Sequence, residues 1–342
     1  MGLSLGERQL KQRVATALLG SLVACGARDP EPQGASLRGS GDGVSSGSAD
    51  SGLSGASGSN ASGGSDDSAS SGMASAGREA STAGIWTPPS ASPVHFHWQL
   101  STTFSTTDLL TGQQGSVVYD IDGEGATPAD VAAIHASGAR AVCYVDVGTL
   151  ERGRSDYDQF PASVIGPAVA GWPGENWLLV TAANQSVILP LMKARLMNWC
   201  QSKGFDAIEP DNLDGWTNIT TVMQGDNIAY DLAIAGLAHG LSLSVGLKNT
   251  LSDADASYVP SLTSTFDWAL VEQCYEYSEC PQYMQFISAD KAVWDVEYNV
   301  SPNCMQADGA RMNAQLRDLD LAGPHAAGYE YTPCVPDSQA TW

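Results

Sequence analysis

The most constraining feature of this chain is a regular alternation, from Pro93 onward, of short β-branched and aromatic runs with segments of helical pattern. This alternation is typical of strand–helix units, whose parallel strands pair side by side. Eight runs have the composition of strands: 95–100, 116–121, 139–147, 205–210, 241–247, 266–272, 292–298 and 326–331. We therefore expect an α/β fold in which eight units close into one (β/α)₈ barrel.

Helical patterns occupy the intervals between several of these strands. Thr127 has the chemistry of an N-cap and Pro128 suits the first helical position, which predicts a helix over 128–137. Gly204 and Gly240 are expected to end the next two helices, because glycine adopts the left-handed conformation at a helix end. The remaining expected helices span 187–203, 226–239 and 305–319.

The N-terminus has the layout of an export signal. Basic residues at Arg8, Lys11 and Arg13 precede an apolar run, 14–24, that is too short to span a bilayer. The run ends Leu-Val-Ala-Cys at 22–25, which looks like the lipobox of a bacterial lipoprotein. We expect residues 1–24 to be the signal peptide, with Cys25 lipidated and the exported protein anchored in the outer membrane or at the cell surface. The alternative is an ordinary signal peptide with a chance cysteine.

Residues 25–92 are expected to be a disordered tether between this anchor and the folded body. They are rich in Gly, Ser, Ala and Asp and offer almost nothing to bury. Such a segment cannot offset the entropy lost on ordering. The remaining 93–342 have the length of a single barrel domain, and we expect this domain to be a monomer.

The formal net charge of -22 argues against a nucleic-acid partner, because phosphate-binding surfaces need clustered Lys and Arg. A strongly negative field attracts cationic ligands instead. Acidity for solubility alone is the other interpretation.

Six cysteines follow Cys25, and an even number in an exported protein suggests disulfides. Six cysteines allow fifteen pairings. Spacing favours Cys274 with Cys280 and Cys304 with Cys334. Cys143 and Cys200 either bridge a strand to a neighbouring helix or stay as buried thiols. No CxxC or paired-His spacing indicates a metal site.

Polar residues stand at the ends of seven of the eight expected strands. In a barrel these ends meet on the face where active sites lie. Charged groups at the ends of buried strands are costly unless they are paired or used. The set is Asp120, Asp122, Asp146, Glu209, Asp211, Lys248, Glu272, Glu297 and Glu330.

Clustered carboxylates with neighbouring aromatic residues suit the cleavage of glycosidic bonds. Two carboxylates can act on such a bond without a metal or cofactor, and aromatic rings supply platforms for sugars. From residue 93 onward, neither a glycine-rich phosphate loop nor a GxSxG nucleophile motif is present. The aromatic residues near the acids are Trp98, Tyr119, Tyr144, Trp216, Tyr275, Tyr298, Tyr329 and Tyr331.

Motifs at these positions resemble those of glycoside hydrolase family 114, the endo-α-1,4-polygalactosaminidases. They are WQL at 98–100, YDID at 119–122, WPGENW at 172–177, GFDAIEPDN at 204–212, GLKN at 246–249 and EQC at 272–274. The resemblance covers about 95–334. It also includes Cys143-Tyr144, Arg154 with Asp156, Asp214-Gly215, 277–280 and Glu297-Tyr298. Asp146 departs from it, since many relatives carry a small or hydroxyl residue there.

The resemblance implies hydrolysis of α-1,4-linked galactosamine polymers with retention of configuration, and therefore a cationic amino-sugar polysaccharide as partner. It assigns the catalytic Asp to Asp211 and the catalytic Glu to Glu272. We expect Asp211 to be the nucleophile and Glu272 the acid/base, because Glu272 follows an apolar strand whereas Asp211 lies among polar residues. The expected substrate-binding set is Trp98, Tyr119, Asp120, Asp122, Tyr144, Asp146, Glu209, Asn212, Asp214, Lys248, Glu297 and Tyr298.

Two other functions are compatible with the same strand ends. One is a non-catalytic, lectin-like barrel that binds exopolysaccharide at the cell surface. The other is a hydrolase of a different, N-acetylated sugar polymer.

Overall fold

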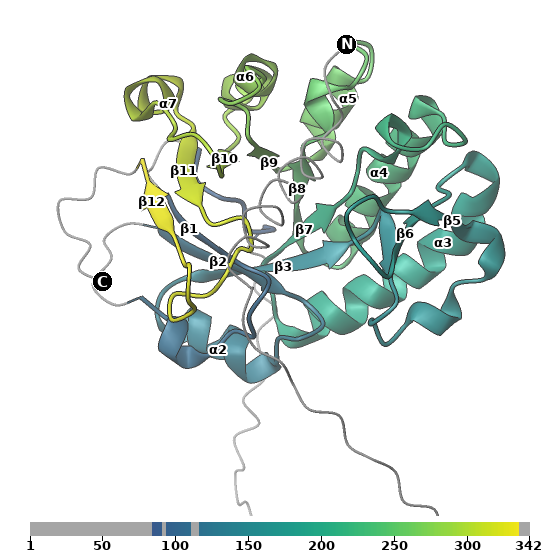
Figure 1. Cartoon of the computed structure of the whole chain (residues 1–342), viewed down its shortest axis with the longest axis horizontal. Helices are drawn as coiled ribbons and strands as arrows, with labels where there is room; N and C mark the ends of the chain where they lie inside the picture. Colours follow the sequence, from purple (N-terminus) through teal and green to yellow (C-terminus); the bar gives the residue numbers. More distant parts are fainter. Residues whose placement is uncertain (1–83, 91–93, 111–115, 335–342) are drawn as a thin grey trace, which may run out of the picture. The chain divides into compact units, whose positions relative to one another are not determined.

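The computed structural model describes residues 84–90, 94–110 and 116–334. Eight parallel strands lie side by side and curve into a nearly closed barrel with helices on its outside (Figure 1). This arrangement confirms the predicted TIM-type α/β fold. In spatial order the strands are β1 (Val94–Gln99), β2 (Ser116–Asp122), β3 (Arg140–Asp146), β7 (Ala207–Asp211), β8 (Ser244–Lys248), β9 (Trp268–Glu272), β10 (Val293–Glu297) and β11 (Asn313–Arg317).

The barrel is joined between β1 and β11 by individual contacts in place of a strand ladder. The backbone N–H of Val94 donates to Asn313 Oδ1 at 3.0 Å. The Arg317 guanidinium donates to the carbonyl of Trp98. A short ninth strand, β12 (Tyr331–Pro333), pairs antiparallel with β11 and covers its other edge.

The predicted helix signals are confirmed at two ends. Thr127 and Asp130 form a reciprocal capping box at the start of α2, with Pro128 in its first turn. Gly204 ends the turns that follow α3 with a φ of +92°. The helices are α2 (Pro128–Ala136), α3 (Ala182–Arg195), α4 (Gln224–Gly240), α5 (Val259–Thr265), α6 (Cys280–Ser288) and α7 (Cys304–Ala310). A π turn, η4 (Leu196–Cys200), follows α3, and 3₁₀ turns occupy Thr106–Asp108, Tyr157–Gln159, Ala162–Val164, Gln201–Lys203, Gly215–Thr217 and Thr250–Ser252.

Seven of the eight predicted barrel strands are confirmed, and the eighth is wrong. The eighth parallel strand is β11, inside the segment predicted to be the helix 305–319. That helix ends at Ala310, after which Arg311 takes a φ of +60°. The predicted strand 326–331 is a loop that leads into β12. Glu330 is therefore not at a barrel strand end.

A second, three-stranded sheet interrupts the alternation between β3 and α3. Its antiparallel strands β4 (Thr149–Glu151), β6 (Glu175–Leu178) and β5 (Ile165–Ala168) were not predicted from the sequence. Figure 1 shows β5 and β6 beside α3. The N–H of Leu178 donates to the carbonyl of Gly148, so this sheet begins directly at the carboxyl end of β3.

Large aromatic side chains fill the barrel interior. Trp268 and Trp294 lie 4.7 Å apart between ring centroids, and Phe96 stacks on Trp294 at 4.4 Å. Gly246 on β8 makes room for this packing, because a Cβ there would lie 2.4 Å from the Trp268 ring. The interior is therefore filled without leaving a pore, as expected for a barrel of eight strands.

Three disulfides connect the body. Cys274–Cys280 and Cys304–Cys334 confirm the pairings favoured by spacing. Cys143–Cys200 settles the pair that the sequence left open, because it joins β3 to the π turn that follows α3.

Some residues before the predicted boundary at residue 93 also contact the barrel domain. Trp86 packs against the apolar cluster inside the barrel, and the Ser90 hydroxyl donates to Asp290 Oδ1 at 2.6 Å. The signal segment, Cys25 and most of the predicted tether lie outside the described residues. Among the residues described, no helix is long and apolar enough to cross a membrane.

Candidate active site

Three neighbouring strands bring four charged side chains together at the carboxyl end of the barrel. Glu209 and Asp211 lie two residues apart on β7, so they share a face, while Lys248 ends β8 and Glu272 ends β9. Lys248 Nζ lies 2.8 Å from Glu209 Oε1, 2.9 Å from Asp211 Oδ1 and 3.4 Å from Glu272 Oε2. One buried ammonium group thus contacts three carboxylates.

The side chain of Trp98 contacts both this lysine and Glu209. Lys248 Nζ lies 4.5 Å from the centroid of the Trp98 ring, and the indole N–H donates to Glu209 Oε2 at 3.0 Å. Burial lowers the pKa of Lys248, but the charges of Asp211, Glu209 and Glu272 outweigh it and raise that pKa well above its usual range. Lys248 is therefore charged. Trp98, only 1% exposed, supports it and does not offer an open face to a sugar.

Asp120 lies deeper in the barrel and is fully buried. Burial, followed by the charge of Glu209, raises the pKa of Asp120 well above its usual range. Burial also raises the pKa of Glu209, to about 8, against the opposing effect of Lys248. Like charges this close do not both ionise. The pKa of Asp120 is therefore raised both by its burial and by its acidic neighbour Glu209.

Glu272 is held by hydrogen bonds on both carboxylate oxygens. Asn249 Nδ2 donates to Oε2 at 2.9 Å, and the Tyr298 hydroxyl donates to Oε1 at 2.5 Å. The Asn249 side-chain oxygen accepts the backbone N–H of Glu272 at 2.8 Å. These contacts fix the orientation of a carboxylate that is 5% exposed.

Asp211 is the more open of the two predicted catalytic carboxylates. Its side chain is 22% exposed, and it accepts a hydrogen bond from the Tyr144 hydroxyl at 3.2 Å in addition to its contact with Lys248. Asp211 and Glu272 thus both contact the ammonium group of Lys248.

Asp146 connects this centre to the small sheet. It accepts the backbone N–H groups of Gly148 at 3.1 Å and Thr149 at 2.8 Å, and Asn212 Nδ2 donates to it at 3.0 Å. The Thr149 hydroxyl contacts Asp146 and also donates to Glu175 Oε1 at 2.5 Å. Burial, followed by the charge of Asp211, raises the pKa of Asp146 to about 6.

Four residues of the predicted substrate-binding set lie outside this cluster. Tyr119 is buried, and its hydroxyl accepts the N–H of Leu110 at 2.8 Å. Asp122 forms an ion pair with Arg154 at 2.5 Å. Asp214 is buried in the loop after β7, where burial raises its pKa to about 7.

Glu297 is the fourth of these residues. It ends β10, and its Oε1 accepts the N–H of Tyr275 at 2.7 Å and that of Glu276 at 3.4 Å. Burial raises its pKa to about 7. Glu297 therefore holds the loop that follows β9 in place.

Three residues that were not among the predicted site residues contact the site in the structure: Asn249, Thr149 and Glu175. Asn249 has a left-handed backbone, with a φ of +53°, that turns its amide toward Glu272. Thr149 and Glu175 come from the small sheet that was not predicted. Their signal in the sequence is the position of Glu175 in the WPGENW run.

One group of potential metal ligands occurs within the described residues: Cys274, Cys280 and Asp295. Both sulfur atoms of this group are joined in a disulfide. It is therefore not available to hold an ion.

The sequence profile of glycoside-hydrolase family GH114 matches residues 75–335, which includes every strand of the barrel. The chain belongs to glycoside hydrolase family GH114. It is therefore a glycoside hydrolase, and Asp211 and Glu272 lie at the end of the barrel where barrel enzymes carry their active site. No curated protein matches the chain.

Ega3 and PelA are two of the solved structures to which this GH114 chain is similar. Ega3 from Aspergillus fumigatus, crystallised in complex with galactosamine, is 26% identical with a TM-score of 0.60, over 73% of this chain and 98% of Ega3. The glycoside hydrolase domain of PelA from Pseudomonas aeruginosa is 13% identical with a TM-score of 0.48, over 67% of this chain and 95% of that domain.

Proposed function

We propose that this GH114 hydrolase is an endo-acting enzyme that cleaves α-1,4-linked galactosamine polysaccharides with retention of configuration. The observation that carries the proposal is the contact of one lysine nitrogen with both Asp211 and Glu272. Asp211 Oδ1 lies 2.9 Å and Glu272 Oε2 lies 3.4 Å from the same nitrogen atom. The distance between these two oxygens therefore cannot exceed the sum of the two distances. This limit is compatible with the separation of about 5–5.5 Å between the carboxyl groups of retaining enzymes.

The surroundings of the two groups support distinct roles. Asp211 is closer to the ammonium and more exposed, which suits a charged nucleophile that attacks the anomeric carbon. Glu272 is more buried and farther from the ammonium, which suits an acid that gives its proton to the leaving oxygen. Water then attacks the glycosyl-enzyme, and Glu272 takes the proton of that water as a base.

The substrate class is supported by charge and by the similar structure. The chain carries a formal net charge of -22, and the Ega3 crystal held galactosamine, an amino sugar. An amine that is protonated near neutral pH is attracted to an acidic surface, whereas an acetamide is neutral.

Incubation of the purified protein with deacetylated and with fully N-acetylated galactosamine polymer tests the proposal. We expect internal cleavage of the deacetylated polymer, seen as a ladder of oligosaccharides by mass spectrometry. Release from the acetylated polymer alone would identify an N-acetylated substrate. Binding of either polymer without any product would identify a carbohydrate-binding barrel that lacks catalysis.

A further inference from the structure

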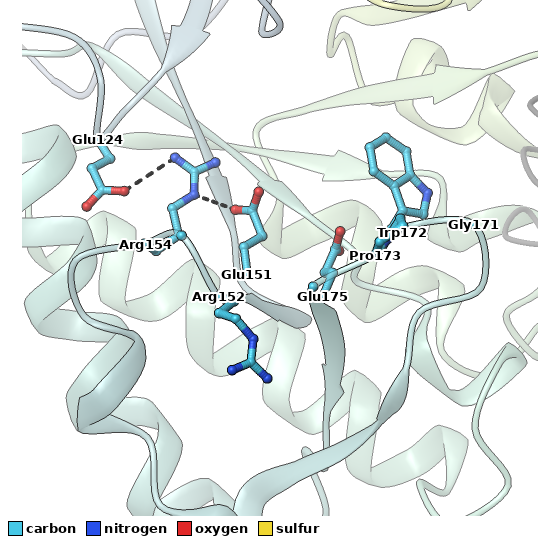
Figure 2. Close-up of a pocket in the computed structure, with 10 residues that line it drawn as sticks. Glu124, Glu151, Arg152, Arg154, Gly171, Trp172, Pro173 and Glu175 are labelled. Atoms are coloured by element: carbon cyan, nitrogen blue, oxygen red, sulfur yellow. Dashed lines mark hydrogen bonds and ion pairs between the residues drawn. The ribbon is translucent and has the colours of Figure 1, made fainter. Parts of the chain in front are cut away.

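A pocket of about 710 Å³ opens beside the catalytic centre, between the carboxyl end of the barrel and the small sheet. Figure 2 shows its main side chains, which come from the β2–α2 loop, from β4 and the segment after it, and from the turn before β6. They are Glu124, Glu151, Arg152, Arg154, Trp172 and Glu175.

Arg154 already forms ion pairs with three acidic side chains. It pairs with Asp122 at 2.5 Å, with Glu124 at 3.5 Å and with Glu151. Arg152 lies 5.5 Å from the Tyr157 ring, and Figure 2 shows its side chain pointing away from Glu151 and Glu175. Neither arginine neutralises the acid at the other end of the pocket.

That acid is Glu175, the first residue of β6. Within the described residues Glu175 has no cationic partner in an ion pair, and its carboxylate contacts the Thr149 hydroxyl at 2.5 Å. Burial, followed by the charge of Asp146, raises the pKa of Glu175 to about 9. Burial among other acids therefore disfavours the charged form of Glu175, and a cation bound beside it would lower that pKa and favour the carboxylate.

Trp172 lies three residues before Glu175, in a turn closed by backbone hydrogen bonds. The N–H of Trp172 donates to the carbonyl of Val169, and the N–H of Glu175 donates to the carbonyl of Trp172, each at 3.2 Å. Gly171 and Gly174 take φ values of +85° and +94° that this turn requires. The indole is 37% exposed, and Figure 2 places it beyond the Glu175 carboxylate on the same side of the pocket.

A chain of hydrogen bonds links the pocket to the catalytic centre. Glu175 contacts Thr149, Thr149 contacts Asp146, and Asp146 accepts the side chain of Asn212, which follows Asp211 in the chain. The charge of Asp211 also acts on Glu175. A sugar in the pocket would therefore lie close to a sugar whose bond is being cleaved.

We propose that this pocket is a subsite for a further amino-sugar residue of the polymer, in which Glu175 pairs with the ammonium group and Trp172 stacks on the sugar ring. The subsite rests on the proposed function and deepens it, because it selects a free amine over an acetamide. Pairing supplies the missing cation, and the indole supplies an apolar face of the kind that holds sugar rings and cations.

Kinetics of four variants on deacetylated polymer test the subsite. Glu175→Gln keeps an oxygen for the Thr149 hydroxyl but removes the charge, and we expect KM to rise about tenfold with a much smaller change in kcat. Trp172→Ala should raise KM by a similar factor, whereas Trp172→Phe, which keeps a ring, should restore most of it. Asp158→Asn removes an exposed charge outside the pocket and should leave KM within about twofold.

A binding titration separates failure of the subsite from failure of the proposed function. The probe is an oligosaccharide of α-1,4-linked galactosamine, titrated into the full-length protein with Glu272→Gln, alone and combined with Glu175→Gln. Weaker binding on loss of Glu175, absent for the N-acetylated oligosaccharide, supports the subsite even if the wild type cleaves nothing. Equal binding with and without the Glu175 carboxylate, or equal weakening for both oligosaccharides, would overturn the subsite while leaving the catalytic pair untouched.

Discussion

Lys248 organises the catalytic centre at the scale of single residues. Its nitrogen contacts Glu209, Asp211 and Glu272, and its side chain lies against Trp98. The sequence predicted these residues because each stands at or near the end of a strand. It could not show that Trp98 is buried and supports the lysine, since burial depends on neighbours from β7 and β8.

Asp214, a buried acid in the loop after β7, makes stability depend on pH. Its folded-state pKa of about 7 lies above the unfolded value of about 3.9. The folded state therefore binds the proton more tightly. The stability from this proton is complete below about pH 4 and is lost as the pH rises through 7.

We predict that Asp214→Asn removes this dependence, because the amide does not titrate. Between pH 5 and pH 9 the wild type should lose about 2–3 kcal/mol of unfolding free energy relative to the variant. Urea unfolding of both proteins at the two pH values measures the difference. Parallel pH profiles for the two proteins would show that Asp214 does not carry it.

At the scale of elements, the strands with β-branched or aromatic runs were predictable, whereas the polar strand β11 and the three short strands of the small sheet were not. β11 holds Asn313, Gln315 and Arg317 within five residues, so its composition does not stand out as a strand. Its place is determined by pairing with β10 and by the contact of Arg317 with β1. The small sheet was missed because its strands have only three or four residues, too few to show a pattern.

Gly246 offers a test of how the barrel interior is packed. A methyl group there would lie 2.4 Å from Trp268, so Gly246→Ala should displace the indole and destabilise the fold by about 1–3 kcal/mol. Gly236→Ala on α4 is the matched control, because no atom lies within 4 Å of its added carbon. Alanine in a helix should leave stability unchanged or raise it by about 0.5–1 kcal/mol. Equal melting temperatures for the two variants would contradict this account of the packing.

At the scale of the whole molecule, the sequence predicts an export signal and a polar segment before the barrel. We propose that Cys25 carries a lipid and holds the enzyme at a membrane. Cys25→Ser should move the protein from the membrane fraction to the soluble fraction of expressing bacteria, with turnover of soluble substrate unchanged. A variant that stays in the membrane fraction would argue for another mode of attachment.

The separate roles of the two carboxylates are tested most directly by azide rescue of Glu272→Ala. The substrate is an α-galactosaminide with a reactive leaving group, and proton NMR reports the configuration of the product. Without its acid/base the enzyme should still form the glycosyl-enzyme on Asp211, and azide should then give an α-configured product at a partly restored rate. A β-configured azide product would mean that Glu272 is the nucleophile and the roles are exchanged. Near-normal hydrolysis by both Glu272→Ala and Asp211→Ala without azide would place the chemistry elsewhere on the barrel.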